Sequence, residues 1–591
     1  MKKITTIGII LLFVGMAFTP TTGFYLDEQF NLVTLNRDTL YVGGTGTGNY
    51  STVQEAINNA GDGDTVFVYD DSSPYYENVI VNKSINLIGE DKDSTVIDGN
   101  MIGDVFYVSA DWVNISGFTI QNTSTRDEGI EIISNHITIA DNNFVSHEYV
   151  GIYSWSLHTS YNNISGNYFT QSRAAIRLRY SDNYIISDNN IVNTGGIHLS
   201  RYCSNNSISN NYIIGTGDTL INNDIQCNNN SIVNNFLSNG SWGIRGDSGS
   251  NYYTNISYNI INNCDLEGIH FQSFNKGVIH GNSITNGRGG IYLRGSNSNM
   301  ISCNVISNCS IEGIYVRLSS ANTIFDNTLT SNYYGLSLYE LSNFNTIIDN
   351  VINSNNGYGI ILDVNCNGNA IFDNNVSFNN GSAIRMKSGS DPSSNNIIYH
   401  NNFINNSLGG HDECSNIWDY GYPSGGNYWS DYNGTDMDGD GIGDTPYNLS
   451  GGDNQDRYPL MYLWGEHPPV ANYTYLILGD GGILFDGSSS YDRDGVIVLY
   501  EWDFDDGTSS QKVVVTHAYN ESGTYDVTLT LTDDDGYQGS YARSIEAEKN
   551  HPPSAPLIDG PIEAKAGKSH FYNFTSEDPE EADVSYYNRM G

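Results

Sequence analysis

One spacing recurs along this 591-residue chain and restricts its fold more than any other feature. The pattern apolar-x-x-Asn-x-apolar repeats at intervals of 22 to 27 residues. A Gly-Ile pair, or a close relative of it, precedes most of these asparagines with the same period. Two landmarks that share one period indicate one structural unit per period. The asparagines are Asn142, Asn167, Asn189, Asn211, Asn235, Asn259, Asn282, Asn304, Asn327, Asn350, Asn374 and Asn401.

The residues of the repeat favour strands over helices. Ile, Val, Tyr, Thr, Asn and Gly dominate it, and its short apolar runs alternate with period two. A unit of this length is typical of one coil of a parallel β-helix, so twelve stacked coils predict a rod of about 55 Å. The asparagines would then lie above one another, bond through their amides and occupy the left-handed backbone of a tight turn. We assign this column a structural role.

The start of the predicted rod resembles the start of pectin-lyase-like right-handed β-helices. It contains a short amphipathic helix at 51–60, with Ser51 and Gln54 as a capping box, followed by strands at 64–70, 78–91 and 94–100. The coils at 129–406 resemble NosD-type, copper-protein-associated repeats, also called carbohydrate-binding and sugar-hydrolase repeats. The resemblance implies a right-handed parallel β-helix over 37–410. It leaves the function open, because that family includes lyases, hydrolases, epimerases and plain binders.

Composition and the first residues bear on the location of the protein. Residues 1–24 have a basic start, an apolar stretch and a small polar exit, which is the pattern of a signal peptide; an uncleaved anchor is the alternative. The chain has 25 Lys plus Arg against 67 Asp plus Glu, a net charge of −42, which argues against nucleic acid or anionic lipid as the main partner. We therefore expect a secreted or cell-surface protein with no membrane span after signal removal.

A cap with a calcium loop is predicted at 411–464, where aromatic and glycine residues replace the repeat. The stretch resembles the tail that follows NosD-like repeats in many archaeal surface proteins. Within it, carboxylates at loop positions 1, 3, 5 and 9 and a backbone carbonyl at position 7 match the ligand spacing of a calcium loop. Position 12 is Tyr447 instead of Glu. The predicted ligands are Asp436, Asp438, Asp440, Ile442 and Asp444, and the alternative is a hydrated acidic turn.

A composition change at His467 introduces the C-terminal part. The stretch 467–549, with YEWDFDDG at 500–507 and GTYDVTLTLTDDDG at 523–536, resembles a PKD domain, which implies an immunoglobulin-like β-sandwich with Trp502 and Phe504 pointing inward. PKD domains usually act as spacers or adhesive modules. Residues 551–591 resemble the first strands of a further sandwich and are expected to form an incomplete domain or a tail without a stable fold. The predicted class is all-β throughout.

A binding face is predicted on the strands that begin with Gly-Ile. The residues one and three places after this pair should point outward, and they combine basic with aromatic side chains. Aromatic faces stack on sugar rings, and Arg pairs with carboxylates or sulfates. An ordinary exposed β-face is the alternative. The candidate carbohydrate-binding residues are Tyr153, Trp155, Arg177, Arg179, Tyr292, Arg294, Tyr315, Arg317 and Tyr339.

The leading interpretation is non-catalytic binding of a polysaccharide or surface glycan on this face. Glycosidases need two suitably spaced carboxylates, and the outward positions offer only scattered acids at Glu131, Asp247, Glu340 and Asp363. A polysaccharide lyase or hydrolase using the same face is the second interpretation, and a structural adhesion stalk is the third. Copper binding has no support, because the His and Met residues show no paired spacing.

Two of the seven cysteines are informative. Cys203 and Cys227 each lie eight residues before a repeated asparagine, so they should stack on adjacent coils about 5 Å apart at Cα. That distance suits a disulfide, and export favours oxidation. Two reduced, stacked thiols are the alternative.

Overall fold

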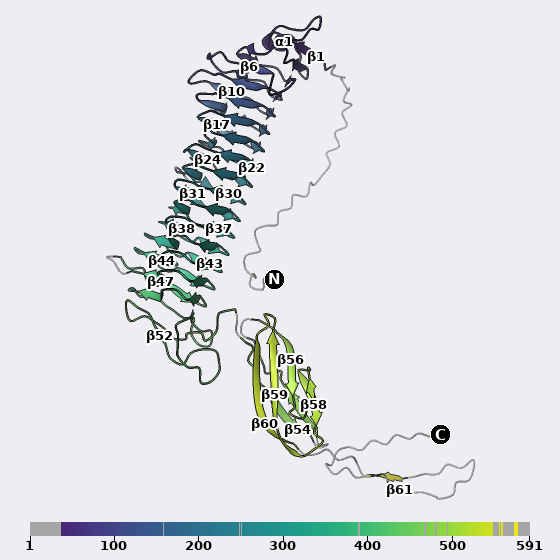
Figure 1. Ribbon diagram of the computed structural model, residues 1–591, viewed down its shortest axis with the longest axis vertical. Coiled ribbons are helices and arrows are strands. Elements are labelled where there is room, and N and C mark those ends of the chain that lie inside the picture. The colour runs from purple at the N-terminus through teal and green to yellow at the C-terminus, as the bar shows by residue number, and fades with distance from the viewer. Residues whose placement is uncertain are drawn as a thin grey trace, which may run out of the picture.

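The chain forms a long rod of parallel strands followed by a β-sandwich (Figure 1). The computed structural model describes residues 37–547, apart from 158, 248, 250, 388–390, 466–467, 479–481 and 493–494, together with 555, 557–559 and 573–576. The predicted signal peptide at 1–24 lies outside the described residues. So does most of the predicted incomplete domain at 551–591, in which the structure describes one antiparallel pair, β61 (Leu557–Asp559) with β62 (Asn573–Thr575).

The rod is a right-handed parallel β-helix, as predicted. Its three sheets, here called A, B and C, contain 16, 16 and 15 strands. Sheet A runs from β1 (Thr39–Val42) to β48 (Ile397–Tyr399), and sheet B from β3 (Tyr75–Tyr76) to β51 (Tyr428–Trp429). Sheet C runs from β4 (Val79–Val81) to β50 (Leu408–Asp412). Sixteen strands make the rod about 70 Å long, since neighbouring strands lie about 4.8 Å apart.

Each turn of the rod contributes one strand to every sheet. In one turn, β38 (Glu312–Arg317) lies in sheet C, β39 (Thr323–Phe325) in sheet A and β40 (Thr328–Thr330) in sheet B. The chain then returns to sheet C as β41 (Tyr334–Tyr339). In the three-residue strands of sheets A and B the middle residue points inward and is buried, so stacked Ile, Leu, Val and Phe side chains form one continuous core. Alternation places the other side chains outward.

The predicted asparagine column is present and buried between sheets A and B. Each amide nitrogen donates to the amide oxygen of the asparagine in the next turn, as from Asn304 Nδ2 to Asn327 Oδ1 at 2.9 Å. The prediction that these asparagines adopt the left-handed backbone is wrong. The residue before each of them adopts it instead, as at Asp326 with φ 54° and Asp349 with φ 54°. Each asparagine of the column points its amide into the rod, and the residue before it turns the chain direction.

Two further asparagine columns run along the other corners of the rod. One joins Asn299, Asn322, Asn345, Asn369, Asn396 and Asn416 through amide bonds of 2.9 to 3.1 Å. The other joins Asn355, Asn379 and Asn406. The predicted column also continues past Asn401 to Asn427 and ends on Asp456, whose carboxylate accepts from Asn427 and from Trp429 Nε1. The amide ladders therefore brace all three corners.

A short helix covers the first turns, but its cap differs from the prediction. Helix α1 (Val53–Asn59) begins after Thr52, whose hydroxyl oxygen accepts from the Glu55 N–H at 3.1 Å. The capping pair is therefore Thr52 with Glu55, and Ser51 lies outside it. At the other end, β51 pairs with β49 (Asn402–Ile404), so the start of the predicted cap continues sheet B.

The second domain is a sandwich of two antiparallel sheets. One contains β54 (Thr474–Ile477), β55 (Gly482–Asp486) and β58 (Val514–Ala518). The other has the order β57 (Ser509–Ser510), β56 (Ile497–Asp503), β59 (Gly523–Asp533) and β60 (Gln538–Ala547). Trp502 and Phe504 point inward and are buried, as predicted.

Candidate functional site

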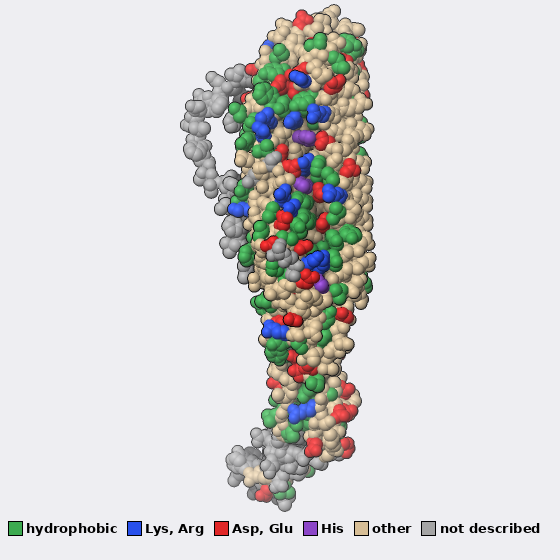
Figure 2. Space-filling model, turned by 90° about the vertical axis from the view of Figure 1, so that its left-hand side faces the viewer, with side chains coloured by type: hydrophobic (Ala, Val, Ile, Leu, Met, Phe, Trp, Pro, Cys, Tyr) green, Lys and Arg blue, Asp and Glu red, His purple; other side chains and the backbone are tan. Residues whose placement is uncertain are grey.

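The outward face of sheet C carries many of the basic, histidine and aromatic side chains of the rod. Figure 2 shows blue, purple and green side chains along this face, with red acidic ones among them. One column, one residue per turn, lies at its centre. It consists of Tyr107, Glu131, Tyr153, Arg177, His198, Asn222, Arg245, His270, Tyr292, Tyr315, Ser337, Ile361, Arg385 and His411.

The predicted binding residues all lie on this face. Their tyrosine rings, however, stack on one another instead of offering open faces to a sugar. His270 stacks on Tyr292 with ring centroids 4.5 Å apart, and Tyr292 stacks on Tyr315 at 5.3 Å. Tyr315 continues to Tyr339 at 6.1 Å. Because each ring covers the face of the next, these tyrosines present their edges and hydroxyls to solvent. Sugar stacking on their faces is therefore disfavoured, and contact through hydroxyl groups is favoured.

Acidic side chains on the same face also offset part of its positive charge. Arg317 pairs with Glu340 at 2.6 Å, and Arg245 pairs with Asp247. Arg177 donates to the Tyr149 hydroxyl at 2.8 Å. Arg294 is exposed on the same face. The face thus presents guanidinium groups among carboxylates and phenols instead of a purely basic strip.

A pocket of about 240 Å³ lies at the middle of this face. Glu267 lies opposite Gly289 in the next turn, and the register continues from Gly289 to Glu312. A side chain at Gly289 would begin 3.2 Å from Glu267 Cγ, so the glycine leaves the gap between the two carboxyl groups open. The lining consists of Glu267, Arg288, Gly289, Ile291, Tyr292, Ile311, Glu312, Tyr315 and Arg317.

Neither glutamate was among the predicted binding residues, all of which follow the Gly-Ile pair. Glu267 and Glu312 immediately precede that pair, in the repeated tripeptide Glu-Gly-Ile. The same tripeptide begins at Glu128 and at no other described position of the chain. The repetition was the available signal.

The two pocket glutamates have opposite electrostatic surroundings. Burial raises the pKa of Glu312, with Arg288 opposing it. Burial also acts to raise the pKa of Glu267, but hydrogen bonds from His270 and Trp242 outweigh it and lower that pKa below its ordinary value. Trp242 Nε1 donates to Glu267 Oε2 at 3.0 Å. Glu312 is therefore the better proton donor of the pair and Glu267 the better acceptor.

A second acidic group lies on the same face nearer the start of the rod. Asp104, Glu128 and Glu131 bring their carboxylate oxygens within 4.8 Å of one another. Trp155, one of the predicted binding residues, donates its indole N–H to Glu131. Burial, followed by the neighbouring Asp104, raises the pKa of Glu128 to about 9.

This shift predicts that the rod loses stability in mild alkali. The folded state holds the Glu128 proton more tightly than the unfolded chain, so the stabilisation is complete below pH 4.5 and is lost as the pH rises through about 9. Glu128→Gln copies the neutral form, and we expect it to flatten the fall in melting temperature between pH 6 and pH 9. Thermal denaturation followed by circular dichroism measures it. Equal slopes for Glu128→Gln and the wild type would contradict the assignment.

The acidic loop has part of the arrangement that calcium needs. Asp436, Asp438 and Asp440 place carboxylate oxygens within 4.8 Å of one another. The Asp436 carboxylate accepts backbone N–H groups of residues 439, 440 and 441 at 2.8 to 3.1 Å. Asp444 lies apart from this group and accepts from the Met437 N–H at 2.9 Å. Three oxygen donors in one turn fit calcium chemistry.

Tyr447, at loop position 12, contacts the end of the rod instead of the acidic group. Its ring stacks on Trp429 with centroids 4.3 Å apart, and its hydroxyl donates to Asp431. Trp429 is part of β51 and is buried in the end of the rod. The residue that would close an ordinary calcium loop therefore anchors this loop to the rod.

The two informative cysteines lie in neighbouring turns, as the repeat predicts. The Cys203 N–H donates to Cys227 Sγ at 3.4 Å, and both side chains are buried. Both are free thiols in the structure, so their disulfide stays a prediction. Burial raises the pKa of the Cys227 thiol, which keeps it protonated near neutral pH.

Comparison with known proteins agrees with both domains. A family model described as periplasmic copper-binding protein (NosD) matches residues 204–355 and 265–434. A right handed beta helix region model matches 103–253, and a PKD domain model matches 466–547.

Each similar protein or solved structure aligns with only part of this chain, and several align over only part of their own length. Collagenase ColA of Clostridium perfringens is 35% identical over 114 residues, which are 19% of this chain and 10% of that protein. The chain spans about a tenth of the length of the curated relatives it matches. The PKD1 domain of Vibrio anguillarum Epp is 33% identical, with a TM-score of 0.14 over 14% of this chain and 98% of that one. PfbA, a surface adhesin of Streptococcus pneumoniae, is 13% identical, with a TM-score of 0.35 over 57% and 89%.

The copper named in the first family description does not fit the residues found here. Copper prefers His, Cys and Met ligands. Within the described part of the chain, the groups of three or more potential ligands are the two carboxylate clusters. No helix among the described residues has the length and hydropathy to cross a bilayer. The chain thus contains a right-handed parallel β-helix, which is similar to the NosD family over 204–434, and a PKD domain at 466–547.

Proposed function

We propose that the outward face of sheet C binds a polysaccharide that carries carboxylate or sulfate groups. The observation that carries the proposal is the pocket at Gly289, whose lining combines two tyrosines and two arginines with Glu267 and Glu312. Phenols exchange hydrogen bonds with sugar hydroxyls, and Arg forms bidentate pairs with carboxylates and sulfates. The same chemistry continues along the rod at Arg294, Arg177 and Arg179.

The repeat distance of the rod supports a chain-like ligand. The central column places one side chain every 4.8 Å or so, and a pyranose unit in an extended chain is of similar length. A polysaccharide lying along the axis would meet successive turns. Binding would then gain from many weak contacts in series.

A titration tests this proposal directly. Isothermal calorimetry with hexagalacturonate, with a sulfated hexasaccharide and with neutral cellohexaose should give binding of the two anionic chains and much weaker binding of the neutral one. Equal affinity for all three, or heat from none of them, would overturn it.

A hydrolase is the second candidate, because Glu267 and Glu312 both line the pocket. They are two strands apart, about 9 to 10 Å at Cα. Inverting glycosidases separate their carboxyl groups by roughly 6.5–9.5 Å, leaving room for a water, and two side chains that lean slightly toward each other from this Cα spacing would fall within that range. Glu312 would give its proton to the leaving glycosidic oxygen. Glu267 would take a proton from the water that attacks the anomeric carbon.

Product release separates the enzyme from the binder. If the pair is catalytic, Glu312→Gln and Glu267→Gln each lower the release of reducing ends by at least about 100-fold. Both variants should still bind the chain. An absence of new reducing ends from the wild type on every polymer that it binds leaves binding as the function.

We also propose that the protein is exported and displayed outside the cell. NosD is a periplasmic family by its description, and PKD domains occur in secreted proteins. The signal peptide pattern at 1–24 supports this location. A rod of about 70 Å would hold a binding face away from its point of attachment.

The acidic loop supports a structural calcium ion at Asp436, Asp438 and Asp440. Because Tyr447 ties the loop to Trp429, calcium binding should stabilise the end of the rod. We expect calcium at about 100 times its Kd to add about 2.7 kcal/mol, and a chelator to remove it. Asp436→Asn/Asp440→Asn should abolish the calcium-dependent rise in melting temperature, while Asp453→Asn, outside the group, should keep it. A rise of the same size in the double variant would contradict the site.

A further inference from the structure

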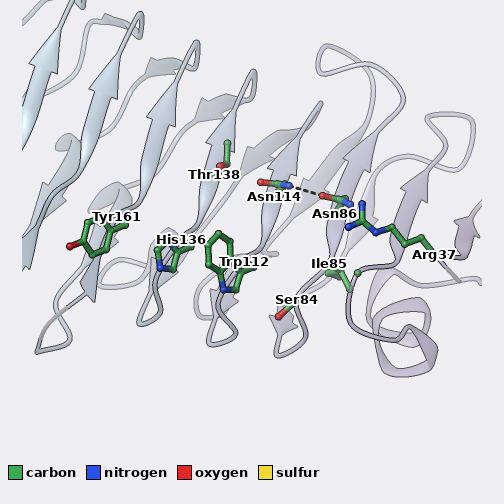
Figure 3. Close-up of a pocket in the computed structure, with 10 residues that line it drawn as sticks. Arg37, Ser84, Ile85, Asn86, Trp112, Asn114, His136, Thr138 and Tyr161 are labelled. Atoms are coloured by element: carbon green, nitrogen blue, oxygen red, sulfur yellow. Dashed lines mark hydrogen bonds between the residues drawn. The ribbon is translucent and has the colours of Figure 1, made fainter. Parts of the chain in front are cut away.

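A hollow of about 560 Å³ lies on the outer surface of sheet A, beside the corner where the chain passes from sheet C to sheet A. It is separate from the sheet C face described above. Figure 3 shows the side chains around it. They come from the first turns of the rod, at the edge of sheet A. The volume is within the usual range for ligand pockets, roughly 300–1,000 Å³. The lining residues are Arg37, Gly63, Ser84, Ile85, Asn86, Trp112, Asn114, His136, Thr138 and Tyr161.

Three aromatic rings on consecutive turns form the wall of this hollow. Trp112 stacks on His136 with ring centroids 3.9 Å apart and planes within 3°. His136 stacks on Tyr161 at 5.4 Å and 7°. Trp112 and Tyr161 are 65% and 61% exposed, although large aromatic rings are usually buried. The stack is rigid because each ring supports the next.

One face of the Trp112 indole is left open. His136 covers one face, and the register of Asn86 with Asn114 places Ser84 beside the other. In the turn before that, the corresponding position is Gly63. Small residues in two successive turns therefore leave space where the stack would otherwise continue. This differs from sheet C, where Tyr292 and Tyr315 cover each other.

The three aromatic residues occupy equivalent positions in the loops between sheets C and A, and the turns that follow have other residues there. All three share a left-handed backbone, at φ 61° for Trp112, 58° for His136 and 60° for Tyr161. Asparagine and glycine adopt this conformation most easily, and bulky residues pay about 1–2 kcal/mol. The next three turns place Asn183, Asn205 and Asn229 there.

Polar groups line the rest of the hollow. Asn114 Nδ2 donates to Asn86 Oδ1 at 2.6 Å, which orients both amides on the outer surface of sheet A. Arg37 lies at the far end from Trp112 (Figure 3). Among the described residues that line the hollow, its guanidinium is the only permanently charged group and none is a carboxylate. In a chain of net charge −42, this is an unusual environment.

We propose that this hollow is a second saccharide site, which takes a pyranose ring bearing a carboxylate. The sugar ring lies on the open face of Trp112, where its C–H groups meet the indole π-surface. Its hydroxyls bond to the amides of Asn86 and Asn114, and its carboxylate pairs with Arg37. The site is distinct from the sheet C face, so the two can fail independently.

The test uses the full chain on a background that removes the other site. Tyr292→Ala/Tyr315→Ala disables the proposed sheet C site, and expression in a host without N-glycosylation keeps the Asn114-Ile-Ser sequon bare. Trigalacturonate is titrated by calorimetry into this background, into the background with Trp112→Ala and into the background with Ser84→Tyr. Ser84→Tyr fills the hollow while Trp112 and Arg37 remain. A third variant, Arg37→Gln, is compared on trigalacturonate and on its methyl ester.

We expect saturable binding in the background and at least a tenfold loss in both Trp112→Ala and Ser84→Tyr. Arg37→Gln should weaken the acid form about tenfold and leave the ester unchanged. Unchanged circular dichroism and melting temperature of Ser84→Tyr show that its effect is local. No binding in the background, or equal affinity in the background, Trp112→Ala and Ser84→Tyr, would overturn the proposal, and either result would leave the sheet C site untouched.

Discussion

Asn304→Ala should destabilise the rod by about 3–6 kcal/mol, the largest effect expected of a single substitution here. The Asn304 amide nitrogen donates to the Ile279 carbonyl and to Asn327 Oδ1, both at 2.9 Å. Its amide oxygen accepts the backbone N–H and the side-chain N–H of Asn282, both at 2.9 Å. Alanine removes these four hydrogen bonds from a fully buried corner. The Asn282 amide nitrogen keeps the Ile256 carbonyl as an acceptor, but the Asn282 backbone N–H loses the Asn304 oxygen. A buried N–H left unpaired costs about 1–3 kcal/mol, and each of the other lost bonds costs about 0.5–1.5 kcal/mol.

The effect should be local, because each turn of a solenoid contacts only its neighbours. Native-state hydrogen exchange should show the strongest loss of protection in the turns next to residue 304, with less change at both ends of the rod. Asn356→Ala is the control, since that asparagine is exposed, and it should change stability by no more than about 0.5 kcal/mol. Equal protection in the two variants would mean that the amide column does not hold the turns together.

Tyr292→Ala/Tyr315→Ala should weaken binding of an anionic hexasaccharide by roughly 30- to 100-fold. Each tyrosine contributes a hydroxyl to the pocket and a ring to the stack that runs from His270 to Tyr339. Two lost hydrogen bonds between phenols and sugar, at about 1–1.5 kcal/mol each, amount to about 2–3 kcal/mol. Calorimetric titration of the double variant against the wild type measures the loss.

A matched pair of rings elsewhere on the rod provides the control. Tyr212 and Phe236 also stack on adjacent turns, with centroids 4.8 Å apart, but they lie on sheet B. Tyr212→Ala/Phe236→Ala also removes two aromatic rings that stack on adjacent turns, without touching sheet C. If both double variants lose affinity equally, the loss reflects the rod as a whole and the sheet C proposal fails.

The fold could be predicted because the sequence repeats the same interactions in every turn. An asparagine such as Asn304 appears with a fixed period, since its partner is always the asparagine one turn away. The two other amide columns were missed although Asn322 and Asn327 both stand in the repeat, five residues apart. The prediction searched for one asparagine per turn, whereas the rod has three corners, each with its own need for hydrogen bonds.

The site was harder to predict because it depends on side-chain packing between turns. That the sheet C residues face outward follows from alternation along the strands. That Arg317 pairs with Glu340, or that tyrosine rings cover one another, depends on rotamers in neighbouring turns. Gly289 lies just before Gly290, the repeat glycine of its turn, and only the register shows that Gly289 separates Glu267 from Glu312. The Trp112 stack lies in corner loops, where the sequence has no apolar period to reveal it.

The most direct test of the central claim is a crystal structure of the protein with a bound anionic hexasaccharide. We predict density for the sugar chain along sheet C, with hydroxyls within hydrogen-bond distance of the Tyr292 and Tyr315 phenols and an acidic group beside Arg288 or Arg294. Density that leaves the Gly289 pocket empty while the ligand occupies sheet A or sheet B would contradict the assignment of sheet C as the binding face.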